Sequence, residues 1–422
     1  MRTVLHVLCQ RPALTGSGVT LERLATEARA LGWRSAAVVG VPVDAPAEGA
    51  GLDGVVAVRF ASGASDDPLH LPHPVVGMSD VMPYDSRTWS SLDARELEAY
   101  ERAFTAAIER AVAAFAPDVV HVHHAWLAAA LARRAVPERI PVVVHGHGSD
   151  LRQIELAPAV ATRARADLAR VDRLVALHPE QAAAYARHWG IDPARTEVVG
   201  SGFDPVRFDP TGRERWRAQR IVFVGKLARA KGVDALLEAF ARVRRARPRA
   251  ELVLVGGGGG EESEALRARA RELSGVVLAG RLDDGDLVRA LQSAAVFALP
   301  SLWEGVPLVL LEAAAAGALA VATDLPGVEG VLAEPLGDAL HLVRGPRSEG
   351  GERCADGEFE PFVERLEAGL RAALDAARRG HRPDARRLAP FTWRAVTERV
   401  GRVWSAALDD RAAGVDRGPG AP

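Results

Sequence analysis

Two lysines on one short loop are the feature of this sequence that points most directly to chemistry. Of 53 lysine and arginine residues, only Lys226 and Lys231 are lysines, and the chain contains no asparagine, as a GC-rich coding bias would produce. The apolar stretch 220–224 resembles a buried strand, and an amphipathic pattern begins at Gly232. Two ammonium groups on a strand-to-helix loop predict an anion site, most plausibly for phosphate. The alternative is that two surface lysines lie together by chance.

A pair of glutamates forms the second candidate site. Glu304 follows a strand-like run that ends at Pro300, and Pro307 suits the first turn of a helix because its missing N–H costs nothing there. We therefore expect Glu304 in a loop and Glu312 in the helix. Free amides at a helix start bind phosphate or sugar oxygens, and carboxylates accept hydrogen bonds from hydroxyls. The pattern favours a nucleotide sugar, although a capping glutamate and a solvated helix carboxylate would also explain it.

Short apolar runs alternate with helical stretches along both halves of the chain. Strands are expected at 3–8, 35–41, 119–122, 141–145, 173–176, 196–199, 220–224, 251–255, 275–279, 296–299 and 319–322. Helices are expected at 21–31, 95–115, 126–135, 159–169, 180–188, 360–378 and 393–408. This rhythm is typical of parallel sheets covered by helices on both faces. We therefore predict an α/β protein with two doubly wound domains and ligands at the carboxyl ends of the strands.

Breaks in the pattern suggest the domain boundaries. A Gly/Pro-rich stretch at 200–212 reads as a hinge. We expect an N-terminal domain at 1–205, a C-terminal domain at 206–390, a helix at 391–408 that packs back towards the N-terminal domain, and a disordered tail at 409–422. The proline-rich segment 61–91 has little periodicity and is expected to form either a binding lid or a disordered loop, and its Met78, Met82, Tyr84 and Trp89 favour the lid.

Composition narrows the choice of compartment and partners. The length of 422 residues predicts two or three domains, and a net charge of −2 gives no electrostatic reason to bind nucleic acid. No apolar run is long enough for a signal peptide or a membrane span, so no integral membrane association is expected. Cys9 and Cys354 lie far apart and suggest no disulfide framework, which fits the reducing cytoplasm.

These motifs together resemble a known family. Glu304 and Glu312, preceded by Pro300-Ser301 and followed by a small-residue helix ending at Gly317, resemble the signature of family 4 of the retaining glycosyltransferases. The loop 224–232 resembles the diphosphate-binding element of that family, 200–208 resembles its interdomain segment, and 322–327 resembles the strand and turn after the second glutamate. The resemblance implies a GT-B fold, with two Rossmann-like domains facing each other across a cleft. It also implies a retaining hexosyltransferase that uses a nucleoside diphosphate sugar as co-substrate, without a metal or other cofactor.

The resemblance also assigns the donor site. It implies that Lys226 and Lys231 neutralise the diphosphate, that Glu304 contacts the donor sugar and that Glu312 holds the ribose. Further expected donor contacts are Gly16, Gly18, Arg281, Leu282, Gly305, Val306, Pro307 and Leu308. Cations and helix-terminal amides would stabilise the charge that grows on the leaving diphosphate. The first basic position is usually arginine in this family, so Lys226 would contact the diphosphate without a bidentate fork.

The resemblance implies that the C-terminal domain, 206–390, binds the nucleotide sugar and that the N-terminal domain, 1–205, binds the acceptor. Gly16-Ser17-Gly18 lies between the first strand and a helix expected near Thr20, where glycine allows close approach of a ligand, although a simple tight turn would explain it equally well. The family often has a functional histidine at a strand end near the donor sugar, and this favours His145 over His147. The expected catalytic residues are thus His145, Lys226, Lys231 and Glu304. The expected acceptor contacts are Ser17, Met78, Tyr84, His123, His124, His147, Asp150 and Arg152.

Three other functions remain open from the sequence. A metal-dependent hydrolase could use the His-x-His pairs as ligands with Asp150, a nucleotide-sugar epimerase of GT-B-like fold would need no acceptor, and a non-catalytic protein would only bind the sugar nucleotide. The composition and the unusual segment 77–84 suggest a small-molecule acceptor in bacterial specialised metabolism, such as antibiotic biosynthesis. The nucleotide base, the sugar and the oligomeric state are not determined by the sequence.

Overall fold

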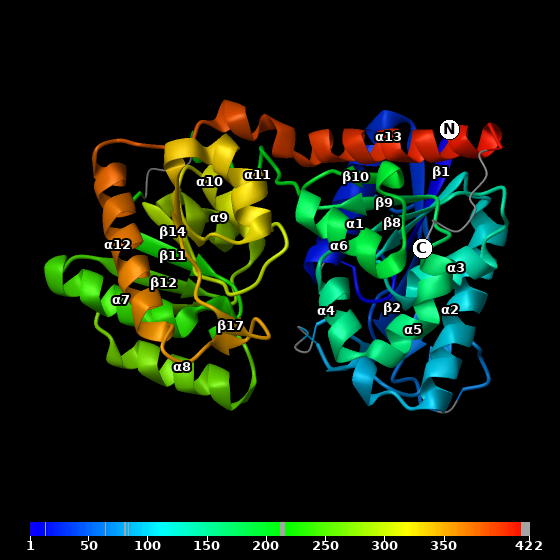
Figure 1. Ribbon diagram of the computed structural model, residues 1–422, viewed down its shortest axis with the longest axis horizontal. Coiled ribbons are helices and arrows are strands. Elements are labelled where there is room, and N and C mark those ends of the chain that lie inside the picture. Colours follow the sequence, from blue (N-terminus) through cyan, green and yellow to red (C-terminus); the bar gives the residue numbers. More distant parts are fainter. Residues whose placement is uncertain (13, 64, 80–81, 83, 212–215, 415–422) are drawn as a thin grey trace. The chain divides into compact units, whose positions relative to one another are not determined.

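The chain divides into two compact units, each with its own sheet. The computed structural model describes residues 1–422 except 13, 64, 80–81, 83, 212–215 and 415–422 (Figure 1). The first unit comprises Met1–Ser201 together with Trp393–Pro422, and the second comprises Gly202–Thr392. The last helix, α13 (Trp393–Ala412), contacts helix α1 (Gly16–Ala28) of the first unit. Residues 409–412 are therefore helical, in contrast to the disordered tail that we expected, and the rest of that tail from 415 on lies outside the described residues.

An eight-stranded parallel sheet forms the centre of the first unit. Its order is β10-β9-β8-β7-β1-β2-β3-β4. The strands are β1 (Arg2–Leu8), β2 (Trp33–Pro42), β3 (Gly54–Phe60), β4 (His70–Leu71), β7 (Val119–His123), β8 (Val142–His145), β9 (Arg173–Ala176) and β10 (Thr196–Val198). Strands β3 and β4 were not predicted. In the register, His6 of β1 pairs with His121 of β7, and His123 pairs with His145 of β8.

Successive side chains along each strand point to opposite faces of this sheet, and the two faces differ in character. Leu5, Val7, Val120 and Val122 point into an apolar core with side chains of α2 (Ala94–Phe115), α3 (Leu127–Ala135), α5 (Pro158–Leu168) and α6 (Pro179–Trp189). The other face carries the histidines and contacts α13. The remaining short helices are η1 (Arg29–Leu31), η2 (Trp89–Ser91), α4 (Ser149–Leu156) and η3 (Pro193–Arg195), of which α4 was not predicted.

The second unit is built around a six-stranded parallel sheet of order β13-β12-β11-β14-β15-β16. The strands are β11 (Arg220–Val224), β12 (Glu251–Val255), β13 (Val276–Gly280), β14 (Val296–Leu299), β15 (Leu319–Thr323) and β16 (Leu340–Val343). Their apolar residues make near-continuous runs because helices cover both faces. The chain moves from β11 to β12 and β13 in one direction and then returns to the other side of β11 with β14. The strand order therefore reverses between β11 and β14, and ligands bind at such points in doubly wound folds.

Helices cover both faces of the second sheet. One face packs against α7 (Val233–Ala246), α8 (Gly260–Glu272) and α12 (Phe359–Arg378), which share a core with β11, β12 and β14. On the other side lie α9 (Asp284–Ser293) and α10 (Leu308–Ala315), which contact β11, β14 and β15. The remaining elements are η5 (Arg229–Lys231), α11 (Pro326–Leu336), η6 (Gly337–Ala339), η7 (Ala385–Phe391) and the hairpin β17 (Ser348–Glu349) with β18 (Arg353–Cys354). The fold class predicted from the sequence, two doubly wound parallel sheets, is confirmed.

The segment 61–91 packs against the first unit, in contrast to the lid that we expected. It contains the paired short strands β5 (Val75–Val76) and β6 (Ser86–Arg87). Met78 is 2% exposed, and its sulfur accepts a hydrogen bond of 3.3 Å from the indole of Trp89. Met78 is therefore a core residue, and its predicted contact with an acceptor is wrong in this conformation. Tyr84 is half-buried and accepts a hydrogen bond from the Arg11 backbone. Asp80, Val81 and Pro83 lie outside the described residues.

Two further features bear on the compartment. Neither Cys9 nor Cys354 is in a disulfide, and Cys9 is buried. Among the described residues, none of the helices combines the length and the apolar character that crossing a membrane would require.

Candidate functional site

The lysine loop and the glutamate loop meet at the point where the second sheet reverses its strand order. The lysine loop leaves β11 at Gly225 and ends at Gly232, which has a φ of +65°. A Cβ at Gly232 would lie 2.0 Å from the carbonyl oxygen of Pro300, so only glycine lets the two loops approach this closely. The backbone N–H of Leu302 also donates to the carbonyl of Ala230 at 3.0 Å. Backbone contacts therefore fix the two loops as one structure.

Within this structure, the Lys231 ammonium and the Glu304 carboxylate form an ion pair. Lys231 Nζ lies 2.6 Å from Glu304 Oε1, and the Ser301 hydroxyl donates to the same oxygen at 2.8 Å. The two charged side chains keep 26% and 17% of their surface exposed, so a ligand can still reach them. Lys226 and Glu312 are half-buried on the same edge of the unit, in the lysine loop and in α10.

A run of five glycines, 256–260, borders the lysine loop and was not recognised from the sequence as part of the site. Gly256 has a φ of +123°, and a Cβ there would lie 2.0 Å from the carbonyl oxygen of Gly225. The N–H of Leu227 donates to the carbonyl of Gly257 at 3.0 Å. A glycine run after a predicted strand was the available signal, because such backbone allows a phosphate to approach closely.

The other predicted donor residues lie on the same edge of the second sheet. Arg281 is exposed and Leu282 is half-buried directly after β13. Gly305 packs so closely on Gly327 that a Cβ at Gly327 would lie 1.8 Å from its carbonyl oxygen. Val306 and Pro307 are buried and precede Leu308, the first residue of α10. The structure thus gathers on one edge every donor residue predicted in this unit, whereas Gly16 and Gly18 belong to the first unit.

Replacing Gly232 with alanine tests this loop packing. We expect the free energy of unfolding to fall by about 1 to 3 kcal/mol, because the alanine must adopt a left-handed backbone and its Cβ would collide with Pro300. Thermal unfolding measures this change. Gly330→Ala is the control, since its Cβ would meet no atom within 4 Å and helix α11 favours alanine. Equal melting temperatures for the two variants would contradict the prediction.

In the first unit, Gly16-Ser17-Gly18 is the first turn of α1, which begins at Gly16 and not near Thr20 as expected. Thr15 caps the helix by accepting the N–H of Gly18 at 3.2 Å. The Ser17 hydroxyl accepts from the Gln10 amide at 2.7 Å and lies 3.0 Å from His124 Nε2. A Cβ on Gly16 would meet no atom within 4 Å apart from its chain neighbours, so there is open space at Gly16, whereas Ser17 is only 3% exposed.

Asp150 has a structural role in the first unit. It is fully buried and accepts the N–H of Ala125 at 2.7 Å and the N–H of His147 at 3.3 Å. The Tyr185 hydroxyl donates to its other oxygen. Asp150 thus joins the segments that follow β7 and β8, and the predicted acceptor contact is wrong in this conformation because the carboxylate is enclosed. Arg152 is half-buried.

Histidines gather on the sheet face that α13 covers. His6, His121, His123 and His145 are fully buried and His124 is 2% exposed, while His147 is half-buried. Burial lowers the pKa of His6 and His145 to about 3 and that of His124 to about 4, and it lowers the pKa of His121, His123 and His147 well below 6.5. These rings are therefore neutral at neutral pH.

The burial of His145 contradicts the catalytic role predicted for it. His145 lies at the end of β8 as expected, but its ring has no exposed surface, and His123 is equally enclosed. His147 is the partly exposed member of the cluster, and its Nε2 lies 3.1 Å from His123 Nδ1. A ligand at this edge of the first unit would meet His147, so the roles predicted for His145 and His123 are wrong in this conformation. His124 is 2% exposed and its Nε2 lies 3.0 Å from the Ser17 hydroxyl, so its predicted contact with an acceptor is also wrong in this conformation.

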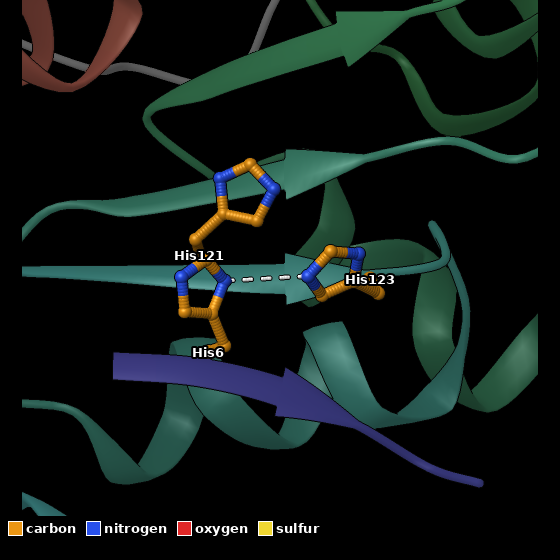
Figure 2. A group of neighbouring side chains, drawn as sticks. All are labelled: His6, His121 and His123. Carbon is orange, nitrogen blue, oxygen red and sulfur yellow. Dashed lines mark hydrogen bonds between the residues drawn. The ribbon is translucent and has the colours of Figure 1, made fainter. Parts of the chain in front are cut away.

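Figure 2 shows three of the histidines as a possible metal-binding group. His6, His121 and His123 each place a nitrogen within 4.8 Å of the others, and His123, His145 and His147 form a second such group. His6 Nδ1 and His123 Nε2 are 3.3 Å apart. A metal ligand must offer an unshared electron pair, and a neutral imidazole has only one.

A hydrogen bond from the Trp404 indole of α13 determines the protonation of His121 and, through it, of His145. Its N–H donates to His121 Nδ1 at 2.9 Å, so neutral His121 carries its own proton on Nε2. His121 Nε2 lies 3.3 Å from His145 Nδ1 and donates to it. The electron pairs of His121 and His145 are thus already engaged. Each group therefore lacks one of its three ligands, and the hydrogen-bond pattern does not fit the metal-dependent hydrolase considered above.

Comparison with known proteins agrees with the geometry of the second unit. Residues 15–202 match the model of a glycosyl transferase 4-like domain, and residues 218–345 match that of the group 1 glycosyl transferases. A D-inositol 3-phosphate glycosyltransferase of Geodermatophilus obscurus is 30% identical over 404 residues, which cover 86% of this chain and 83% of the relative. The chain belongs to the family 4 glycosyltransferases. A glycogen synthase of Mycobacterium tuberculosis is 29% identical over 311 residues, or 69% of each chain.

Solved structures show that this glycosyltransferase has the GT-B fold. Sucrose-phosphate synthase from Thermosynechococcus elongatus superposes with a TM-score of 0.67 and 19% identity, covering 97% of this chain and 100% of that one. Anabaena HepE in complex with UDP-glucose gives a TM-score of 0.63 at 16% identity, covering 96% of this chain and 99% of that one. At these identities the likeness concerns the fold, and the family assignment rests on the sequence matches.

Proposed function

We propose that this glycosyltransferase moves a sugar, with retention of configuration, from a nucleoside diphosphate sugar to a small-molecule acceptor. The observation that supports this most directly is the Lys231–Glu304 pair at the strand-order reversal of the second unit, with its 2.6 Å separation. A cation for phosphate and a carboxylate for hydroxyls are thereby held side by side on rigid backbone. Both groups retain exposed surface.

The donor would lie along the carboxyl edge of the second sheet. Lys226 and Lys231 would neutralise the diphosphate, together with the amides of 305–308 at the start of α10. Glu304 would accept hydrogen bonds from the sugar hydroxyls, and Glu312 from the ribose. Arg281 and Leu282 would contact the base. As the sugar bond breaks, negative charge grows on the diphosphate, and the two ammonium groups stabilise that charge more than the ground state. No metal is needed for this role, and no enzymic nucleophile is assigned.

The acceptor would meet the carboxyl edge of the first sheet. Polar groups that stay partly exposed on this unit belong to Tyr84, His147 and Arg152. Ser17, a further predicted contact, is 3% exposed, and its hydroxyl is engaged with Gln10 and His124. His147 takes the place that the sequence had suggested for His145. The names of the relatives suggest phosphorylated cyclitols and glucans as the first acceptors to test. A specialised metabolite is a further acceptor class, which the composition suggests.

A thermal-shift panel of UDP, GDP, ADP and dTDP, with EDTA present, tests the proposal. Because HepE was solved with UDP-glucose, we expect UDP to stabilise the wild type. A ligand at about a hundred times its Kd adds roughly 2.7 kcal/mol, which raises the melting temperature by several degrees. Lys231→Ala and Glu312→Ala should show a smaller shift than the wild type. A wild type that no nucleotide stabilises at millimolar concentration would contradict the proposal. Conversion of the donor sugar without any acceptor would instead indicate an epimerase.

A further inference from the structure

One tryptophan of the second unit is exposed beside the proposed sugar site. Trp303 retains 37% of its surface, and it is the aromatic member of the large exposed apolar side chains among the described residues. Six of the eight tryptophans in the chain are 6% exposed or less, and Trp216 is half-buried. An indole left open to water loses the favourable burial that the other tryptophans have, so its position calls for an explanation.

Trp303 is adjacent to Glu304 in the loop between β14 and α10. The neighbours on both sides of it are fixed. Leu302 bonds through its backbone to Ala230 of the lysine loop, and the Glu304 carboxylate bonds to Lys231 and Ser301. The indole therefore projects from a rigid stretch of backbone at the strand-order reversal, and not from a loosely held loop.

The hairpin of β17 and β18 packs against the Cβ and Cγ atoms of Trp303. Gly351, in the turn of the hairpin, has a φ of +70°, and a Cβ there would lie 3.2 Å from Trp303 Cβ and 3.7 Å from its Cγ. The hairpin thus contacts the base of the indole on one side. The exposed 37% of the residue shows that part of this side chain is left uncovered by the chain itself.

A sugar ring matches both parts of this arrangement. Its hydroxyls need hydrogen-bond acceptors such as the Glu304 carboxylate, and the C–H groups of its ring form an apolar face that packs against an aromatic surface. We propose that Trp303 is a sugar-recognition residue, whose indole packs on the donor's sugar ring while Glu304 accepts its hydroxyl hydrogen bonds. This inference rests on the proposed function, because it takes the donor sugar to lie at Glu304.

The proposal predicts that Trp303 contributes to the binding affinity for the sugar part of the donor and not to that for the nucleotide part. Loss of one aromatic contact corresponds to a roughly 10-fold to 100-fold weaker Kd. Calorimetric titration of wild type and Trp303→Ala with UDP, and then with UDP-glucose, separates the two ligand parts. We expect Trp303→Ala to bind UDP with the Kd of the wild type and UDP-glucose with the weaker Kd. Trp303→Phe should keep most of the affinity for UDP-glucose, because it retains an aromatic face.

Val277→Ala is the matched control, since Val277 is also an exposed apolar residue of the second unit, at 49%, but lies within β13. It should leave both Kd values unchanged. Equal weakening of UDP and UDP-glucose by Trp303→Ala, or no change in either, would overturn the inference while the proposed function stands. If the wild type binds neither ligand, nor the corresponding pair for GDP, ADP or dTDP, the proposed function itself fails and the inference fails with it.

Discussion

Replacing Lys231 with alanine is expected to lower kcat for sugar transfer by roughly 100-fold to 1,000-fold, the range seen when one group that stabilises transition-state charge is removed. The substitution removes a cation proposed to face the leaving diphosphate, and it also leaves the Glu304 carboxylate without the partner now 2.6 Å away. Since the diphosphate gains charge as the sugar bond breaks, the loss should be larger in kcat than in donor binding. Steady-state kinetics with the donor identified by the nucleotide panel measures both.

Arg229→Ala is the matched control for this variant. Arg229 is a basic residue of the same loop, but its side chain is 55% exposed and lies 4.0 Å from Asp234. Its removal should change kcat by less than about 5-fold, because solvent screens an exposed surface charge. Lys231→Arg should fall between the two, because it keeps the charge but not the compact ammonium geometry. A Lys231→Ala enzyme as active as the Arg229→Ala enzyme would refute the assigned role.

Acid is expected to unfold the first unit between pH 6.5 and about 4. The five buried histidines on the face covered by α13, and the half-buried His147, have pKa values below 6.5 because burial disfavours the charged ring; His6 and His145 are at about 3 and His124 is at about 4. Once the chain unfolds, each would regain a pKa near 6.5. As the pH falls below 6.5 the unfolded state takes up protons that the folded state cannot, so the free energy of unfolding falls with pH.

The magnitude makes this one of the largest effects expected for the protein. At pH 5, each such histidine lowers the free energy of unfolding by about 2 kcal/mol, since one pKa unit corresponds to about 1.36 kcal/mol. Three of them would remove about 6 kcal/mol, which is comparable with the total stability of a typical domain. Urea unfolding at pH 8, 6.5, 5.5 and 5, followed by tryptophan fluorescence, measures the effect. Above pH 7 the stability should no longer change through these groups.

Two variants test whether the buried histidines cause the pH dependence. His6→Leu removes one fully buried ring, so the slope of stability against pH between 6.5 and 5 should decrease by about one proton. His188→Leu removes an exposed ring and should leave the slope unchanged. A wild-type protein equally stable at pH 8 and pH 5 would show that the rings are solvated in solution and would contradict their observed burial.

The geometry of the proposed donor site was largely predictable because the sequence signals are local. Each of its segments is a strand followed by a loop, and the carboxyl ends of parallel strands meet at one edge of a sheet. The strand expected at 220–224 coincides with β11, and that at 296–299 coincides with β14. Placing Lys231 and Glu304 on the loops after these strands was therefore enough to bring them to the same edge. The glycine run at 256–260 was missed, although it follows the predicted strand 251–255.

Errors in the first unit have a different origin. Strand β3 was missed although its valines and Phe60 are good strand formers, and its pairing with β2 confirms it as a strand. Helix α4 was missed, and the contacts of Asp150 with distant backbone N–H groups help to hold it in place. The expected lid contains core residues such as Met78 because Trp89 packs over its sulfur. The period of a strand could not tell what covers the sheet face on which His123 and His145 lie.

Family membership, the two parallel sheets and the neighbouring positions of the lysine and glutamate loops were determined by the sequence alone, because they depend on short motifs and on strand order. The accessibility of the histidines was decided only by the tertiary structure. Trp404 comes from a helix more than 250 residues further along the chain than His121, and its N–H bond of 2.9 Å fixes the proton positions of His121 and His145. Burial and proton position are set by whichever element covers a sheet face, and residue spacing along one strand carries no information about that distant partner.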